Sequence, residues 1–136
     1  MRSSIGHYPT VIHASWAEGE AMDLHEADQV ERLLGRLATD FRSVPAMVEL
    51  VHENGASLAI GLGREDSVLS LVVQPDGPYL LSDGEDEDGP SIWFDYFGSP
   101  SEFRRRSAIP VDLAVAAALE FVRSGTPPTR VTFVRV

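Results

Sequence analysis

The sequence predicts an α+β fold: a mostly antiparallel sheet of about six to seven strands with two helices packed on one face. Two observations lead to this class. Between residues 46 and 97, short apolar or alternating runs follow one another with only turn residues between them, and strands joined by short turns pair antiparallel. Two segments with helical spacing of apolar residues lie on either side of these runs, near residues 23–41 and 110–124.

The chain is expected to begin with a strand and then a helix. Tyr8–Trp16 is rich in β-branched residues and favours a strand, and residues 17–22 are expected to form a loop. A helix is expected over Asp23–Phe41, with Asp23 as its N-cap, because one apolar stripe follows at helical spacing. Gly35 inside this helix is interpreted as a point of close approach to the sheet.

The next signal is the dipeptide Asn54-Gly55 between two apolar runs, Ala46–Glu53 and Ala56–Leu62. It predicts a hairpin with a two-residue type I′ turn. That turn sets the expected register, which places Val51 opposite Leu58, Glu49 opposite Ile60 and Met47 opposite Leu62. Both faces of the hairpin are mainly apolar, so it is expected to lie inside the sheet.

Three further strands are expected, over Ser67–Gln74, Tyr79–Ser82 and Ile92–Phe97, and the last is expected to continue the meander. An irregular stretch follows from Gly98. A second helix begins near Pro110 and ends at a Gly125 C-cap. The alternating tail RVTFVRV predicts a final strand.

The aromatic strand has two distinguishable faces. Ile92, Phe94 and Tyr96 are expected in the core under the helices. The other face, with Trp93, Asp95 and Phe97, is expected on the side of the sheet without helices. There, Trp93 and Phe97 either form a contact patch or are covered by a neighbouring segment.

Length and composition narrow the class of protein. A chain of 136 residues is expected to be one domain, residues 1–136. Without cysteine it has no disulfide, no thiolate metal ligand and no cysteine nucleophile. The longest apolar run, Leu113–Leu119, is far too short to cross a bilayer, and the first residues show no apolar core of a signal peptide. A cytoplasmic location is therefore expected.

The charge of the chain indicates what kind of partner it has. The formal net charge is −10, so phosphate backbones and anionic lipids should repel it, and neither nucleic acid nor membrane is expected as a direct partner. A basic protein would be attracted. All eleven basic residues are arginine, which a GC-rich genome explains without any functional reason.

The most acidic segment lies just before the aromatic strand. It contains Asp83, Glu85, Asp86, Glu87 and Asp88. A calcium loop of the EF-hand type would need glycine at its sixth position and glutamate at its twelfth, but these positions hold Asp88 and Phe94. Three interpretations stay open: a solvated mobile loop, a weak cation site, and a docking surface for a basic protein. The predicted partner-binding residues are these five carboxylates with Trp93 and Asp95.

No pattern for catalysis or cofactor binding is found in the sequence. The four histidines lack metal-like spacing, the serines lack a nucleophile motif, and Gly61-Leu62-Gly63 does not open a helix as a phosphate loop would. Hydrolysis by a pair of carboxylates stays open, because an acidic chain offers many such pairs. The expectation is a protein that is not an enzyme and that holds no metal and no cofactor.

The second half of the chain resembles the Imm1 family of bacterial immunity proteins. The resemblance covers roughly residues 58–136 and rests on the segments PYLLSDGEDEDGP, IWFDYFGSPSEF and AIPVDLAVAAALEFVRSGTPPTRVTFV. Its features are an aromatic strand closed by Gly98, the pair Ile109-Pro110, an alanine-rich helix with Glu120-Phe121, and an aromatic Phe133 in the last strand.

The resemblance implies a cognate toxin domain as partner, often a nucleic-acid deaminase, which the immunity protein binds and blocks in the producing cell. A toxin acting on nucleic acid needs a basic cleft, and an acidic protein complements such a cleft. The competing interpretation is a regulatory or small-ligand-binding α+β module with no toxin partner.

Overall fold

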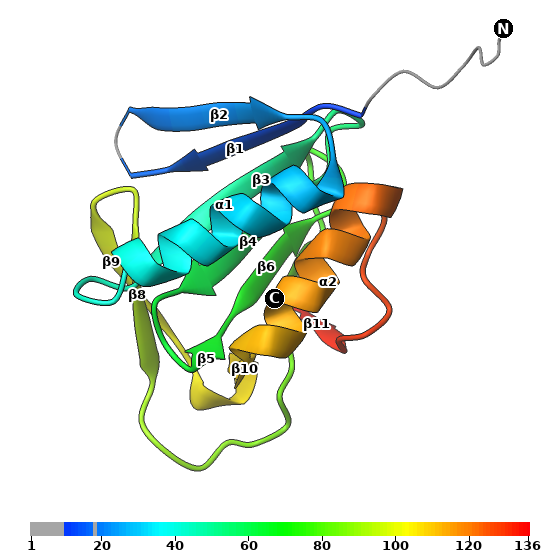
Figure 1. Ribbon diagram of the computed structural model, residues 1–136. Helices are drawn as coiled ribbons and strands as arrows, with labels where there is room; N and C mark the ends of the chain where they lie inside the picture. The colour runs from blue at the N-terminus through cyan, green and yellow to red at the C-terminus, as the bar shows by residue number, and fades with distance from the viewer. Residues whose placement is uncertain (1–9, 18) are drawn as a thin grey trace, which may run out of the picture.

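A computed structural model describes residues 10–17 and 19–136 of the chain. The protein consists of one large sheet with both helices packed on the same face, and a separate two-stranded sheet that pairs residues 66–67 with 109–110 (Figure 1). A β-hairpin lies against the opposite face, where it forms a second, smaller hydrophobic core. The predicted α+β class, with two helices on one face of a mainly antiparallel sheet, is confirmed.

The helices and strands follow in chain order. They are β1 (Ile12–Trp16), β2 (Glu20–Leu24), α1 (Ala27–Asp40), β3 (Ala46–His52), β4 (Ser57–Leu62), β5 (Asp66–Ser67), β6 (Leu69–Val72), β7 (Tyr79–Ser82), β8 (Ile92–Tyr96), β9 (Ser99–Phe103), η1 (Arg105–Ser107), β10 (Ile109–Pro110), α2 (Val111–Ser124) and β11 (Phe133–Arg135). None of the described helices is long and apolar enough to cross a membrane.

The main sheet has the strand order β11-β7-β6-β4-β3-β1-β2, and β8 and β9 branch from it at β3. The branch is a parallel contact between Ala46 and Asp95. The expectation that the aromatic strand continues the meander is therefore wrong, since β7 pairs with β6 and β11 instead. Three strands were also missed: β2 overlaps the expected loop and the first residues of the expected helix, and β9 and β10 lie in the expected irregular stretch.

The first helix starts later than its sequence predicts. Its N-cap is Glu26, which exchanges capping hydrogen bonds with Gln29, and helical residues begin at Ala27. Asp23 is not the N-cap, because it lies in β2 and accepts a hydrogen bond from His13 Nδ1 at 2.6 Å. Gly35 is exposed and a Cβ there would meet no atom within 4 Å, so its interpretation as a point of close approach is wrong.

The β3–β4 hairpin has a different register from the expected one. His52 pairs with Ala56 through a backbone bond of 2.8 Å, so three residues form the turn, and only Gly55 has a positive φ (95°). This is a three-residue turn rather than type I′, and it shifts the pairing by one residue. Leu50 lies opposite Leu58 and Val48 opposite Ile60, which places all four on the helix side. The prediction that this hairpin lies inside the sheet is confirmed.

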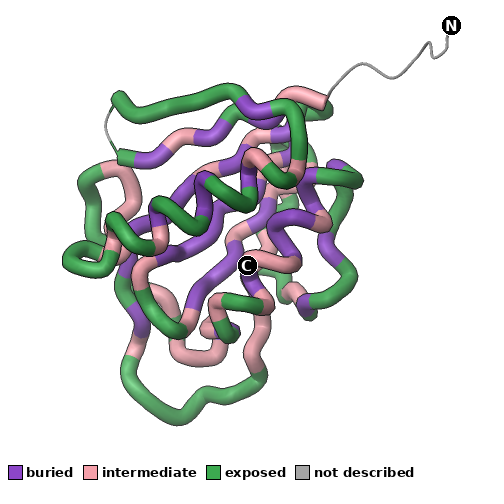
Figure 2. The backbone as a smooth tube through the Cα atoms, in the orientation of Figure 1, coloured by how far each residue is buried: buried purple, intermediate pink, exposed green. Residues whose placement is uncertain are grey.

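The hydrophobic core lies on both sides of the sheet. Figure 2 shows that buried residues are concentrated in the central strands of the sheet. The larger cluster joins the sheet to α1 and α2. The smaller one, on the other face, consists of Met47, Ala59, Val68, Ile92 and Phe94. The prediction of Ile92 and Phe94 as core residues is confirmed, but their expected place under the helices is wrong.

Both ends of the second helix agree with the sequence. Pro110 is its N-cap, and Gly125 closes it with φ of 69° in the left-handed region. The tail then forms β11 against β7, with Val134 opposite Leu81. Of the first expected strand, Ile12–Trp16 is observed as β1, and Tyr8 and Pro9 lie outside the described residues.

The Phe94 ring lies directly on Gly61 in β4, where an added Cβ would come within 2.6 Å of the ring. We expect Gly61→Ala to destabilise the protein by about 1–3 kcal/mol, because the ring and the hairpin that carries it must move. The measurement is the free energy of unfolding in urea.

Gly35→Ala is the matched control, since it adds the same methyl group where nothing lies within 4 Å. It should stabilise the protein by about 0.5–1 kcal/mol through helix propensity. Equal effects of the two substitutions would contradict the packing assigned to Gly61.

Candidate functional site

The acidic loop, residues 83–88, is anchored at its first residues to three other segments of the chain. The fully buried Ser82 hydroxyl donates to the Ser107 carbonyl oxygen (2.6 Å) and accepts from the Leu69 N–H (3.0 Å). The next residue, Asp83, donates its N–H to the Thr132 carbonyl oxygen at 2.8 Å. These hydrogen bonds hold the start of the loop against β6, η1 and the segment before β11.

Asp83 forms a bidentate ion pair with Arg106. The guanidinium Nε lies 2.9 Å from Asp83 Oδ1 and Nη2 lies 3.2 Å from Oδ2, and the Asp83 side chain is only 7% exposed. Its Oδ1 also accepts the Glu85 N–H at 2.9 Å. The hydrogen bond from Arg106, followed by that from Glu85, lowers the pKa of Asp83 below its ordinary value of 3.8.

Two neighbouring arginines also contact the acidic loop and its flanks. Arg104 Nη2 lies 2.8 Å from Glu87 Oε1. Arg105 donates from Nε to the Pro90 carbonyl oxygen at 2.9 Å and from Nη1 to Asp66 Oδ2 at 3.1 Å. The segment 104–106 was expected to be irregular. Arg104 directly follows β9, and Arg105 and Arg106 begin η1, so all three guanidinium groups lie beside the loop or its flanks.

Gly84 lets the backbone of the acidic loop approach the backbone of residues 106–108. Gly84 donates its N–H to the Arg106 carbonyl oxygen at 2.6 Å, and an added Cβ would overlap the Ala108 carbonyl oxygen. The acidic loop is therefore packed backbone against backbone at this point.

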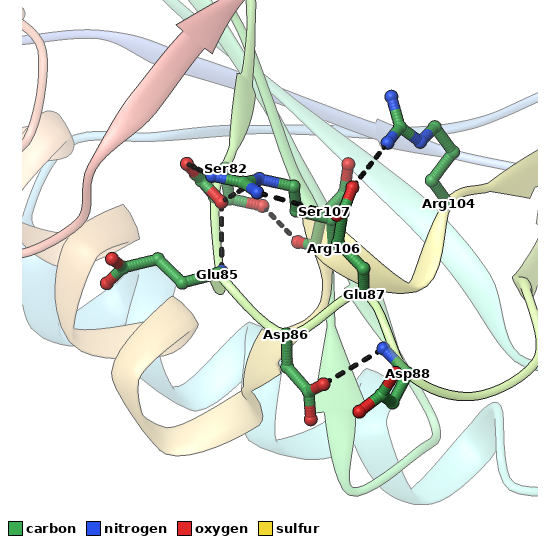
Figure 3. A network of polar contacts seen from close by, with 9 residues as sticks. Ser82, Glu85, Asp86, Glu87, Asp88, Arg104, Arg106 and Ser107 are labelled. Atoms are coloured by element: carbon green, nitrogen blue, oxygen red, sulfur yellow. Dashed lines mark hydrogen bonds and ion pairs between the residues drawn. The ribbon is translucent and has the colours of Figure 1, made fainter.

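Three of the five loop carboxylates are left without a cation. Glu85, Asp86 and Asp88 are exposed, and no ion pair to them is found among residues 10–17 and 19–136. Figure 3 shows their side chains pointing away from Arg104 and Arg106. Asp86 Oδ1 accepts the Asp88 N–H at 3.0 Å, which fixes the tip of the loop. Within the acidic loop, these three residues are the carboxylates that face solvent without an ion pair among the described residues.

The loop leads directly into β8, whose outer face carries an aromatic side chain between carboxylates. Trp93 is 46% exposed and lies opposite Glu102 of β9, and Asp95 follows on the same face opposite Pro100. The sequence-predicted residues Trp93 and Asp95 are thus brought together on one face. Asp95 Oδ2 also accepts the Gly98 N–H at 3.0 Å, in the turn of the hairpin.

The sequence reasoning missed Glu102 because β9 was expected to be irregular. The available signal is the two-residue turn Phe97-Gly98, where both residues have positive φ (51° and 90°) as a type I′ hairpin requires. A bulky residue is rarely found at such a φ, so the turn was not predicted.

The indole of Trp93 projects from a backbone that is held in place. Arg64 Nε donates to the Trp93 carbonyl oxygen at 2.9 Å, and its guanidinium lies 5.7 Å from the centroid of the Phe94 ring. On the opposite side of the hairpin, the Tyr96 hydroxyl lies 3.2 Å from Glu49 Oε2. Burial, together with the Glu49 carboxylate, raises the pKa of Tyr96 to about 12.

We name the combined feature the acidic–aromatic surface. It comprises the acidic loop and the outward-facing side chains of the β8–β9 hairpin: Asp83, Glu85, Asp86, Glu87, Asp88, Trp93, Asp95 and Glu102. Within the described part of the chain, no group of three or more His, Cys, Asp or Glu residues is placed to hold a metal ion. Chemically, the surface can pair with cations and bury an apolar contact around the indole.

Comparison with known protein families defines the class: the chain is an immunity protein. It belongs to the Imm1 family, whose model, described as immunity protein Imm1, matches residues 18–135. The family resemblance read from the second half of the sequence is thereby confirmed, and the match extends it to the first half. A search of curated proteins gave no match.

Asp83→Asn should lower the thermal unfolding midpoint at neutral pH, because it removes the carboxylate held by Arg106. A depressed folded-state pKa stabilises the protein above the unfolded-state pKa, and this contribution is lost as pH falls through the folded-state value. The difference between Asp83→Asn and the wild type should therefore be full above about pH 5 and shrink below about pH 4. Thermal unfolding followed by circular dichroism across this range measures it.

Asp88→Asn is the control, because Asp88 is exposed and makes no ion pair within the described residues. It should change the midpoint little at any pH. A pH-independent difference for Asp83→Asn would show that the carboxylate charge is not what stabilises the loop.

Proposed function

We propose that this chain binds and neutralises a cognate toxin domain of a polymorphic toxin system through the acidic–aromatic surface. The toxin is a basic domain that acts on nucleic acid, with a nucleic-acid deaminase as the leading candidate. Neither nucleic acid nor membrane is contacted directly in this proposal, and the immunity protein performs no chemistry of its own.

The observation that carries the proposal is the unequal pairing of charges in the acidic loop. Asp83 and Glu87 are paired with Arg106 and Arg104, whereas Glu85, Asp86 and Asp88 face solvent. Clustered carboxylates without cations repel one another, and a basic partner would relieve that repulsion. A cleft that binds a nucleic-acid backbone provides the arginine and lysine side chains required.

The arginines support binding by holding the loop in one conformation. A loop that is already ordered loses less conformational entropy when a partner binds, so more of the contact energy appears as affinity. In this proposal Asp83 is a positioning residue, because its carboxylate is nearly buried against Arg106. Glu85, Asp86 and Asp88 then make the charged contacts.

Trp93 supplies the apolar anchor. Tryptophan, with tyrosine and arginine, is enriched among the residues that contribute most of the binding energy at protein interfaces. Trp93 is 46% exposed, its carbonyl group is fixed by Arg64, and the carboxylates of Asp95 and Glu102 lie beside it. A partner with an apolar contact surrounded by cations would match this arrangement.

Charge reversal tests the electrostatic part of the proposal. The triple variant Glu85→Lys, Asp86→Lys and Asp88→Lys should weaken binding to the toxin domain by at least about 100-fold at low salt. It should also flatten the dependence of affinity on salt concentration, because fewer ion pairs form across the interface. Isothermal titration or surface plasmon resonance at several salt concentrations measures both.

A control with the same net charge change is Glu31→Lys, Asp40→Lys and Asp76→Lys, which alters exposed residues on α1 and in the turn before β7. This control should retain most of the affinity. If both triple variants bind equally, the net charge and not the acidic loop determines binding.

Truncation of Trp93 tests the aromatic part. Trp93→Ala should weaken toxin binding by about 2 kcal/mol or more, which is roughly 30-fold in the dissociation constant. Tyr79→Ala removes another exposed aromatic ring, 57% exposed and far along the sheet, and should leave the affinity unchanged. Both variants should unfold at nearly the wild-type temperature, since neither ring is buried.

Co-expression of this immunity protein with the product of the neighbouring gene, followed by pull-down, tests whether that product is the cognate toxin. A stable complex that suppresses toxicity supports the proposal. The absence of a complex with any neighbouring product would contradict a toxin encoded beside this chain.

A further inference from the structure

Arg64, in the turn between β4 and β5, differs from the other arginines beside the acidic–aromatic surface. Arg104, Arg105 and Arg106 each form an ion pair with a carboxylate of the acidic loop or with Asp66. Arg64 is exposed, and it makes no ion pair within the described part of the chain. It is therefore a positive charge without a counterion beside a surface that consists mainly of carboxylates.

The Arg64 guanidinium is held in position from two sides. Its Nε donates to the Trp93 carbonyl oxygen at 2.9 Å, and its Cζ lies 5.7 Å from the centroid of the Phe94 ring. Within the described residues, neither Nη1 nor Nη2 makes a hydrogen bond. The N–H groups on these two nitrogens are therefore available to an acceptor, on a side chain whose orientation is already fixed.

A hollow of about 590 Å³ opens beside Arg64 and has room for a side chain of a partner. Trp93 and the ion pair between Arg105 and Asp66 also line it. Because that ion pair is neutral overall, the charged groups of the lining that lack a counterion are Arg64 and Glu65, which make no ion pair with each other. Arg64 is thus the cation of the hollow that can accept a carboxylate.

Arg64 and Glu102 lie on opposite sides of Trp93. Glu102 is the residue of β9 directly opposite Trp93. The Trp93 carbonyl group points away from β9, because it accepts from Arg64, and the N–H of Asp95, two residues on, likewise bonds to Pro45 rather than to β9. The exposed indole therefore has an unpaired carboxylate on one side and an unpaired guanidinium on the other.

We infer that Arg64 binds a carboxylate of the toxin domain and determines which basic partners this chain accepts. The inference rests on the proposed function, because it takes the toxin to bind at Trp93. An aspartate or glutamate of the toxin enters the hollow, and basic groups of the toxin face Glu102 and the acidic loop. A guanidinium binds a carboxylate with two parallel hydrogen bonds. A toxin with a cation at this point is repelled, which excludes other basic proteins.

Reversing the charge of Arg64 tests the inference, because it and general attraction predict opposite effects. Arg64→Glu makes the chain more negative, so general attraction alone would tighten binding to a basic domain. If Arg64 binds a carboxylate, the variant weakens binding by at least about 30-fold at low salt, and the loss shrinks as salt rises. Isothermal titration with the toxin domain encoded by the neighbouring gene measures both.

Arg64→Gln separates binding of a carboxylate from support of the Trp93 backbone. Both variants remove the Nε–H group that holds Trp93, but only Arg64→Glu repels a carboxylate. Arg64→Gln should therefore weaken binding about tenfold less than Arg64→Glu. The control is Arg123→Glu, which makes the same charge change at an exposed residue of α2 without an ion pair in the described chain. It should bind at least as tightly as the wild type.

Tighter or unchanged binding by Arg64→Glu overturns the inference, and so does equal weakening by Arg64→Glu and Arg64→Gln. Circular dichroism shows whether each variant is folded. If Arg64→Glu does not fold, the salt dependence of Arg64→Gln decides: loss of an ion pair across the interface flattens it, and an unchanged or steeper dependence overturns the inference. A wild-type chain that binds no toxin domain contradicts the proposed function instead, so the two failures are distinguishable.

Discussion

The contact between the Phe94 ring and the backbone of Gly61 is the constraint on which the rest of this structure depends. A side chain at Gly61 would leave no space for the ring, so the missing Cβ allows the β8–β9 hairpin to lie flat on the face without helices. With Phe94 and Ile92 buried there, the alternating residues Trp93 and Asp95 must face outward. The second core and the exposed aromatic face are therefore two sides of one hairpin.

The same hairpin determines the electrostatics of the acidic loop. Its second strand, β9, ends at the three consecutive arginines and delivers them to carboxylates that lie 17 to 39 residues earlier in the chain. Arginine suits this position because its planar guanidinium can bind a carboxylate with two parallel hydrogen bonds, as Arg106 does with Asp83. The loop is thus neutralised at its base and left negative at its tip. The paired carboxylates hold the loop in place, and the unpaired carboxylates at its tip can attract cations.

Sequence reasoning succeeded where the signal was local. The strand β7, the apolar stripe of α1 and the Gly125 C-cap follow from short-range periodicity and capping chemistry, and all are present. It failed where the same residues fit two different local structures and contacts with other parts of the chain selected between them. Asp23 resembles an N-cap, but pairing of β2 with β1 takes that residue into a strand and leaves Glu26 to cap the helix. Asn54-Gly55 resembles a type I′ turn, but the three-residue alternative uses the same glycine at positive φ.

The sequence indicated the residues of the candidate site but not how their charges are paired. The loop carboxylates, Trp93 and Asp95 were chosen from composition and alternation, and their role in binding a partner stays a prediction. The role of Arg104–Arg106 was not predicted, since an arginine cluster carries no information in sequence about which carboxylates it will meet. Glu102 was missed for a related reason: its position opposite Trp93 exists only because Phe97 adopts a φ that sequence statistics disfavour.

By itself, the sequence determined the fold class, most of the strands, both helices, the family and the strongly negative charge. These properties depend on the spacing of neighbouring residues or on simple sums over the chain. The tertiary structure decided the register of the β3–β4 hairpin, the face on which the aromatic strand packs, and which carboxylates remain unpaired. Those outcomes depend on turn length and on the space above Gly61, which are properties of residues brought together from distant parts of the chain.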